Sequence, residues 1–107
     1  MSVLVSDTSI IIDLERGALL EDMFSLPFEF AVPDLLFRRE LSSPLGERLV
    51  ALGLRVEELT AEELASATAV GRERKELSTP DTFAFALAEG RHWPLLTGDG
   101  GLRRLAA

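Results

Sequence analysis

The sequence predicts an α/β fold built on a parallel sheet. Short apolar runs rich in β-branched residues, such as Val3-Leu4-Val5, recur along the chain and are typical of strands buried on both faces. Longer stretches with helix-starting and helix-stopping residues lie between these runs, which indicates that strands and helices alternate. This alternation predicts right-handed crossovers between parallel strands, with no linker, repeat or low-complexity segment interrupting them.

Length and composition limit the classes of protein to consider. The 107 residues predict a single domain over 1–107, and 47% of them are hydrophobic, enough for a core. Neither an apolar run of 18 residues nor a basic N-terminal region is present, so we expect no membrane span, no signal peptide and a cytoplasmic location. The absence of cysteine excludes thiolate zinc sites and cysteine nucleophiles. The net charge of −7 argues against holding nucleic acid by charge alone, but is compatible with carboxylates gathered around a cation.

Cap and turn residues set the boundaries expected in the first half of the chain. Asp7-Thr8-Ser9 caps a helix that Gly17 ends. Pro33, whose fixed φ suits the first helical position, is expected to open a helix that runs to about residue 42. The sequence thus predicts strands over 3–6 and 28–32, and helices over 8–16, 18–24, 33–42 and, after a break at 43–46, up to 52.

Similar signals set the boundaries in the second half. The T-x-x-E pattern from Thr60 to Glu63 is a capping box and predicts a helix to about residue 74. Thr79 as cap and Pro80 at the first helical position predict the next helix, which is apolar on almost every face and therefore buried, and which Gly90 is expected to end. The remaining expected elements are strands over 54–57 and 93–97 and a helix over 102–106.

Four acidic residues are candidates for one site at the carboxyl end of the sheet. Asp7 and Asp99 follow the first and last strands, and Glu40 and Asp81 lie on helices that can converge on the same end. Each alone has a structural explanation: a helix cap, an ion pair or an acid that favours the helix dipole. Four carboxylates around one pocket repel each other, and Mg²⁺ or Mn²⁺ relieves that repulsion.

At this point the sequence resembles the PIN-domain nucleases, which include the toxin ribonucleases of VapBC toxin–antitoxin pairs. Four segments in order carry the resemblance: Val5-Ser6-Asp7-Thr8-Ser9, Leu36-Phe37-Arg38-Arg39-Glu40-Leu41, Leu77 through Ala88, and Pro94-Leu95-Leu96-Thr97-Gly98-Asp99. The resemblance implies a three-layer α/β/α fold with a parallel sheet of about four strands in the order 3-2-1-4. Many members have a fifth edge strand, which we expect to be missing here.

The resemblance also implies an activity, a cofactor and partners. It implies a Mg²⁺- or Mn²⁺-dependent endoribonuclease that hydrolyses RNA and can be the toxin partnered by an antitoxin protein. The implied catalytic and metal-binding residues are Asp7, Glu40, Asp81 and Asp99, supported by Thr8, Ser9 and Thr97, with Arg103 and Arg104 as phosphate contacts. PIN proteins commonly dimerise, so we expect a homodimer, with exposed apolar residues of the early helices or of the helix near Leu49 at the contact.

Other interpretations compete with a nuclease. A catalytically inactive PIN-like module that binds a partner protein or a metal fits the acidic charge and small size. A phosphotransfer or phosphatase fold is weaker, because no D-x-D motif follows the first strand, and Lys75 precedes the third acid, unlike the late lysine of receiver domains. His92, the only histidine, is expected at the surface, and Asp13 and Asp34 are expected to be solvated or to cap helices.

Overall fold

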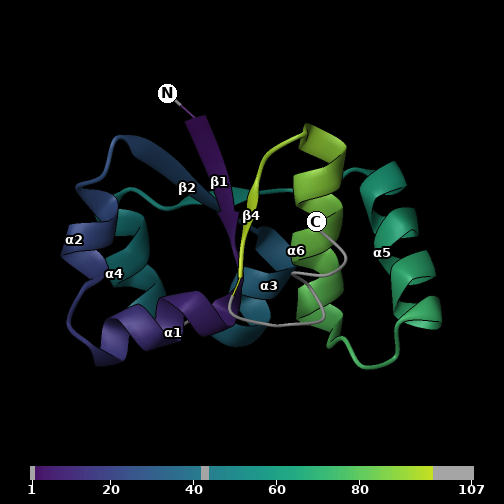
Figure 1. Ribbon diagram of the computed structural model, residues 1–107, viewed down its shortest axis with the longest axis horizontal. Helices are drawn as coiled ribbons and strands as arrows, with labels where there is room; N and C mark the ends of the chain where they lie inside the picture. Colours follow the sequence, from purple (N-terminus) through teal and green to yellow (C-terminus); the bar gives the residue numbers. More distant parts are fainter. Residues whose placement is uncertain (1, 42–43, 98–107) are drawn as a thin grey trace.

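The computed structural model describes residues 2–41 and 44–97, which form a four-stranded parallel sheet flanked by helices (Figure 1). The strands are β1 (Ser2–Ser6), β2 (Phe28–Pro33), β3 (Arg55–Glu57) and β4 (Leu95–Leu96), in the order β3-β2-β1-β4. Register aligns Val5 of β1 with Ala31 of β2 and with Leu95 of β4. The predicted α/β class and the 3-2-1-4 strand order are therefore confirmed.

Helices cover the sheet in two groups, which gives the three-layer α/β/α arrangement. They are α1 (Thr8–Arg16), α2 (Leu20–Phe24), α3 (Asp34–Leu36), the π-helical segment η1 (Phe37–Leu41), α4 (Pro44–Leu52), α5 (Ala61–Glu73) and α6 (Thr79–Arg91). Helix α6 packs on β1, β2 and β4, and α5 packs on α6. Figure 1 shows α2 and α4 on the other side of the strands, where α2 contacts β2. Within the described ranges, no helix has the length and apolar character needed to cross a membrane.

The core forms where β1 and β2 meet the inner faces of the helices. Val5 and Phe30 of the central strands are buried against Ile11 of α1, Leu36 of α3 and Leu87 of α6. The aromatic rings of Phe24 and Phe30 add an edge-to-face contact at 5.6 Å between centroids. Burying these side chains stabilises the sheet that holds the carboxyl ends of β1 and β4 next to each other, where Asp7 follows β1.

Both predicted ends of α6 are wrong. Ser78, not Thr79, is the N-cap, because its hydroxyl accepts a hydrogen bond from the Asp81 N–H. Gly90 does not end the helix, which continues through Arg91 to a left-handed cap at His92 (φ 57°). Gly90 is a packing position inside the helix: a Cβ here would lie 2.5 Å from the Glu63 carboxylate, so the glycine permits close packing of α5. The capping box at Thr60 is confirmed.

The segment after β2 also differs from the expected helix over 33–42. Pro33 is the last residue of β2 and has an extended conformation, so the helix begins one residue later, at Asp34. From Phe37 the chain widens into the π-helix η1, a rare form that recurs at functional sites. Pro44, expected within a break, is the first residue of α4. The sequence also predicts helix 102–106, which lies outside the described residues, as do all of 98–107.

Candidate functional site

Asp7 lies directly after β1 and is almost fully buried, with 1% of its surface exposed. Its Oδ1 accepts hydrogen bonds from the Ile10 N–H at 3.0 Å and the Ser9 hydroxyl at 3.1 Å, and its Oδ2 accepts one from the Thr97 hydroxyl. The Asp7 N–H donates to the Leu96 carbonyl at 3.2 Å, which ties β1 to β4. Asp7 is therefore the N-cap of α1 and joins the carboxyl ends of two adjacent strands.

Glu40 lies in η1 and is exposed, whereas α-helical spacing from Leu36 and Phe37 predicts it at the edge of, or inside, the face that packs on the sheet. The π-helix has a wider turn than the 3.6-residue α-helix on which that spacing rests, so the Glu40 side chain lies further towards solvent than the spacing predicts. The Thr8 hydroxyl donates to Glu40 Oε1 at 2.6 Å. Because Thr8 is the first residue of α1, this contact holds the Glu40 carboxylate next to the residue that follows Asp7.

Asp81 lies in the first turn of α6 and completes a reciprocal cap. Its Oδ2 accepts a hydrogen bond from the Ser78 N–H at 3.2 Å, while the Ser78 hydroxyl accepts from the Asp81 N–H at the same distance. The bond fixes the carboxylate over the helix N-terminus, where negative charge is favoured. Asp81 is half-buried.

One pocket of about 370 Å³ brings these elements together. It opens at the carboxyl end of β1, where α1, η1 and the N-terminus of α6 meet. Its lining residues come from those three elements and are Thr8, Ser9, Ile12, Asp13, Arg16, Glu40, Ser78 and Asp81. We call it the acidic pocket. Two of the predicted site acids, Glu40 and Asp81, thus line the same cavity, with the predicted supporting residues Thr8 and Ser9 between them and the buried Asp7.

Two residues of the acidic pocket were missed by sequence reasoning. Asp13 was assigned to solvent or to a cap, and Arg16 was given no role. Both lie on the face of α1 that carries Ser9, four and seven residues further along the helix. That spacing was visible in the sequence, but the elements that close the pocket over this face come from distant segments.

The acidic pocket contains hard oxygen donors of the kind that Mg²⁺ and Mn²⁺ prefer. Among the described residues, however, no three acidic or histidine side chains approach closely enough to hold an ion together. A hydrated Mg²⁺ needs only one or two carboxylates, because it retains several waters. Glu40 and Asp81 line the pocket and fit that requirement, whereas the Asp7 carboxylate is buried behind it and accepts three hydrogen bonds. Asp99, Arg103 and Arg104 lie outside the described residues.

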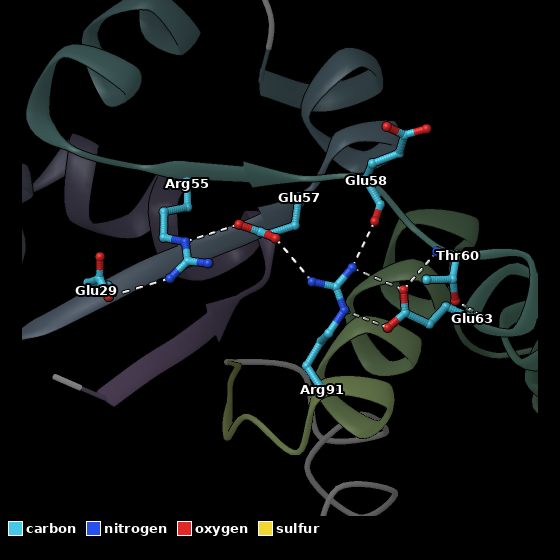
Figure 2. A network of polar contacts seen from close by, with 7 residues as sticks. All are labelled: Glu29, Arg55, Glu57, Glu58, Thr60, Glu63 and Arg91. Atoms are coloured by element: carbon cyan, nitrogen blue, oxygen red, sulfur yellow. Dashed lines mark hydrogen bonds and ion pairs between the residues drawn. The ribbon is translucent and has the colours of Figure 1, made fainter.

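A second polar cluster lies at the opposite end of α6 and is separate from the acidic pocket (Figure 2). The Arg91 guanidinium donates to Glu63 at 2.9 Å, to Glu57 at 3.0 Å and to the Glu58 carbonyl at 2.9 Å. Glu57 in turn accepts from Arg55 at 3.0 Å. Ten residues of helix, or roughly 15 Å, separate Arg91 from Asp81. The cluster therefore joins β3, α5 and α6 and does not contribute to the site.

Comparison with known proteins gives no family assignment. The chain matches no protein-family model, and no curated protein matches it significantly. The fold and the arrangement of side chains are therefore the observations that support a proposal of function.

Proposed function

We propose that this protein is a divalent-metal-dependent endoribonuclease of the PIN type. The observation that supports the proposal is the acidic pocket, where Glu40 and Asp81 meet beside the carboxyl end of the central strand β1. Ligands of open α/β sheets bind at this end of the strands. The sheet order 3-2-1-4 agrees with the order that the PIN resemblance implies.

Glu40 and Asp81 would hold Mg²⁺ or Mn²⁺, with Asp99 as a further candidate ligand and Asp7 as the residue that fixes the start of α1. When bound, such an ion activates a water and offsets the charge that develops on the attacked phosphate. Thr8 orients the Glu40 carboxylate, and the Ser78 N–H orients that of Asp81. RNA is the proposed substrate, and a toxin partnered by an antitoxin protein is the proposed biological setting.

A catalytically inactive PIN-like module is the second candidate. The observation in its favour is that the described residues contain no cluster of three potential ligands. Such a module would still bind a metal or a partner protein at the acidic pocket. The two candidates differ in whether RNA is hydrolysed when metal is supplied.

A cleavage assay with matched variants tests the proposal. A labelled single-stranded RNA is incubated with the protein in Mn²⁺, in Mg²⁺ and in EDTA. We expect metal-dependent cleavage that Glu40→Gln and Asp81→Asn each lower by about 100-fold or more, since each removes a charge from the site. Asn at 81 still offers an oxygen to the Ser78 N–H, so the fold is preserved.

The control for that assay is Glu62→Gln. Glu62 is an exposed acid in the first turn of α5, on the side of the molecule where Glu63 meets Arg91. It is therefore far from the N-terminus of α6, and its variant should cleave at the wild-type rate. Cleavage that survives EDTA, or that both site variants retain, would contradict the proposal, and metal binding without cleavage would favour the inactive module.

A further inference from the structure

Two pockets share the beginning of α6, and each contains one arginine. The acidic pocket includes Ser78 and Asp81 together with Arg16 at the end of α1. The second pocket, about 350 Å³ in volume, lies between α5 and α6 and includes Arg72. Its other lining residues are Ala67, Thr68, Gly71, Leu77, Thr79, Thr82 and Phe83. We call it the α5–α6 pocket.

Neither arginine forms an ion pair with a carboxylate within the ranges that the structure describes. Arg48, Arg55, Arg74 and Arg91 pair with glutamates at 2.6–3.4 Å. Arg16 and Arg72 form no such ion pair, although Arg16 shares its pocket with three carboxylates, those of Asp13, Glu40 and Asp81. In a chain with a net charge of −7, two free guanidinium groups beside one helix turn can attract an anion.

The α5–α6 pocket combines that charge with apolar surface. Phe83 and Leu77 line it together with Arg72, and both are partly or fully buried, which fixes their position. Single-strand binding proteins combine aromatic side chains, on which bases stack, with positive charge along the backbone, and Phe83 and Arg72 place both kinds of residue in this pocket. The volume lies within the range of small-ligand pockets.

The two pockets are also close enough for one nucleic-acid strand to contact both. Residues 78 and 81 face the acidic pocket and residues 79, 82 and 83 face the α5–α6 pocket, so the pockets lie on adjacent sides of the same helix turn. A helix with its side chains is about 10 Å across, which sets the scale of the separation. A flexible single strand can bend over an obstacle of that size.

We propose that a single RNA strand crosses the first turn of α6, with Arg16 binding a phosphate on one side and Arg72 binding a phosphate on the other. The base next to the Arg72 phosphate enters the α5–α6 pocket and contacts Phe83. This inference rests on the proposed ribonuclease function, because it assigns the substrate path on either side of the acidic pocket. It makes single-stranded RNA the preferred substrate over duplex RNA.

The salt dependence of RNA binding tests the proposal without relying on cleavage. Each phosphate contact to a single strand contributes about 0.7 to the slope of log Kd against log salt concentration. Binding of a labelled single-stranded RNA is measured by fluorescence anisotropy in Mn²⁺, on a Glu40→Gln background that prevents cleavage. We expect Arg16→Gln and Arg72→Gln each to reduce the slope by about 0.7, and the double variant to reduce it by about 1.4.

Controls separate these effects from a general change in charge or stability. Arg16→Lys and Arg72→Lys keep the charge and should restore most of the slope. Arg48→Gln removes the same charge from an exposed pair on α4 and should leave the slope unchanged. Phe83→Leu should weaken binding at every salt concentration without changing the slope, because it removes stacking and no charge.

The negative results distinguish an error in the RNA path from an error in the ribonuclease proposal. If either Gln variant binds RNA with the slope of its parent, the path over α6 is wrong, even when the wild type cleaves RNA in a metal-dependent way. If the parent binds no RNA in Mn²⁺ and the wild type cleaves none, both the path and the ribonuclease proposal are overturned. Tighter binding of duplex RNA than of single-stranded RNA also overturns the path.

Discussion

The Thr8 hydroxyl donates a hydrogen bond of 2.6 Å to the Glu40 carboxylate, from a residue 32 positions earlier in the chain. It connects the first residue of α1, fixed by the Asp7 cap, to the π-helix η1. Because Glu40 is exposed, burial does not hold its carboxylate in place. The hydroxyl of Thr8 therefore provides the contact that orients the carboxylate towards the acidic pocket.

The first prediction concerns this contact. Thr8→Val keeps the shape of the side chain and removes the hydroxyl, so Glu40 should become more mobile. We expect the free energy of unfolding to fall by only about 0.5–1.5 kcal/mol, as for one hydrogen bond, while metal-dependent RNA cleavage falls about 10-fold. Thermal melting and the cleavage assay measure the two effects. Ser25→Ala, which removes an exposed hydroxyl at the end of α2, is the control and should cleave normally.

The second prediction concerns Asp7, whose carboxylate accepts three hydrogen bonds. Asn at this position can keep the Ser9 and Ile10 bonds through its oxygen, and its amide can donate to the Thr97 hydroxyl. We therefore expect Asp7→Asn to lower the free energy of unfolding by about 1 kcal/mol, and Asp7→Ala to lower it by about 2–4 kcal/mol because buried donors lose their acceptor. Chemical denaturation of the three proteins measures this order, and equal losses would contradict the assignment of Asp7 as a structural acceptor.

Features that depend on neighbouring residues could be predicted from the sequence, as Thr60 and Asp7 show. The capping box at Thr60 and the cap of α1 by Asp7 form within a single turn, so four consecutive residues determine them. The strand order could be predicted only from what the family resemblance implies, and the sheet has that order. By contrast, the Thr97 bond to Asp7 spans 90 residues and depends on β4 lying beside β1.

The orientation of Glu40 could not be predicted, because the π-helix in which it lies is not encoded by a local period. Helix α4 packs closely against η1, because a Cβ at Gly46 would collide with the Leu41 carbonyl oxygen. The conformation of η1 therefore depends on its contact with α4. Similarly, the place of Arg16 in the acidic pocket depends on η1 and α6, which line that pocket together with α1. Both depend on packing between segments far apart in sequence.

The third prediction concerns assembly. An apolar groove of about 390 Å³ lies beside α1 and α2 and includes four exposed large side chains, Leu19, Leu26, Phe28 and Leu96. Monomers seldom expose a continuous apolar patch of this kind, so we expect a homodimer that covers the groove. Light scattering at micromolar concentration should give twice the monomer mass, and Leu26→Asp should give a folded monomer.

The control for the third prediction addresses the other expected contact, near Leu49. Leu49 is fully buried, whereas its neighbour Val50 on α4 has 49% of its surface exposed. Val50 is not part of the groove, so Val50→Asp should remain dimeric. A wild-type protein that is monomeric at micromolar concentration would contradict the prediction, and dissociation by Val50→Asp alone would place the contact on α4.

The last prediction is that Glu63 makes the fold sensitive to acid. Burial raises the pKa of the Glu63 carboxyl, but hydrogen bonds from the Arg91 side chain and the Thr60 N–H outweigh burial and hold the pKa below its ordinary value. A carboxyl with a lowered pKa in the folded state stabilises the protein fully above its unfolded pKa of about 4.3, and this contribution is lost as the pH falls through the folded pKa.

Denaturation of the wild type and of Glu63→Gln from about pH 7 to pH 3 measures this contribution. We expect Glu63→Gln to lower the free energy of unfolding by about 2 kcal/mol at pH 7, because Arg91 then faces a neutral amide, and the difference to shrink as the wild-type carboxyl is protonated. Glu21→Gln is the matched control, since Arg48 also lowers the pKa of Glu21 but that pair is exposed to solvent and contributes little. A difference between the wild type and Glu63→Gln that stays constant over the whole pH range would mean that Glu63 stabilises the fold by packing alone and not through its charge.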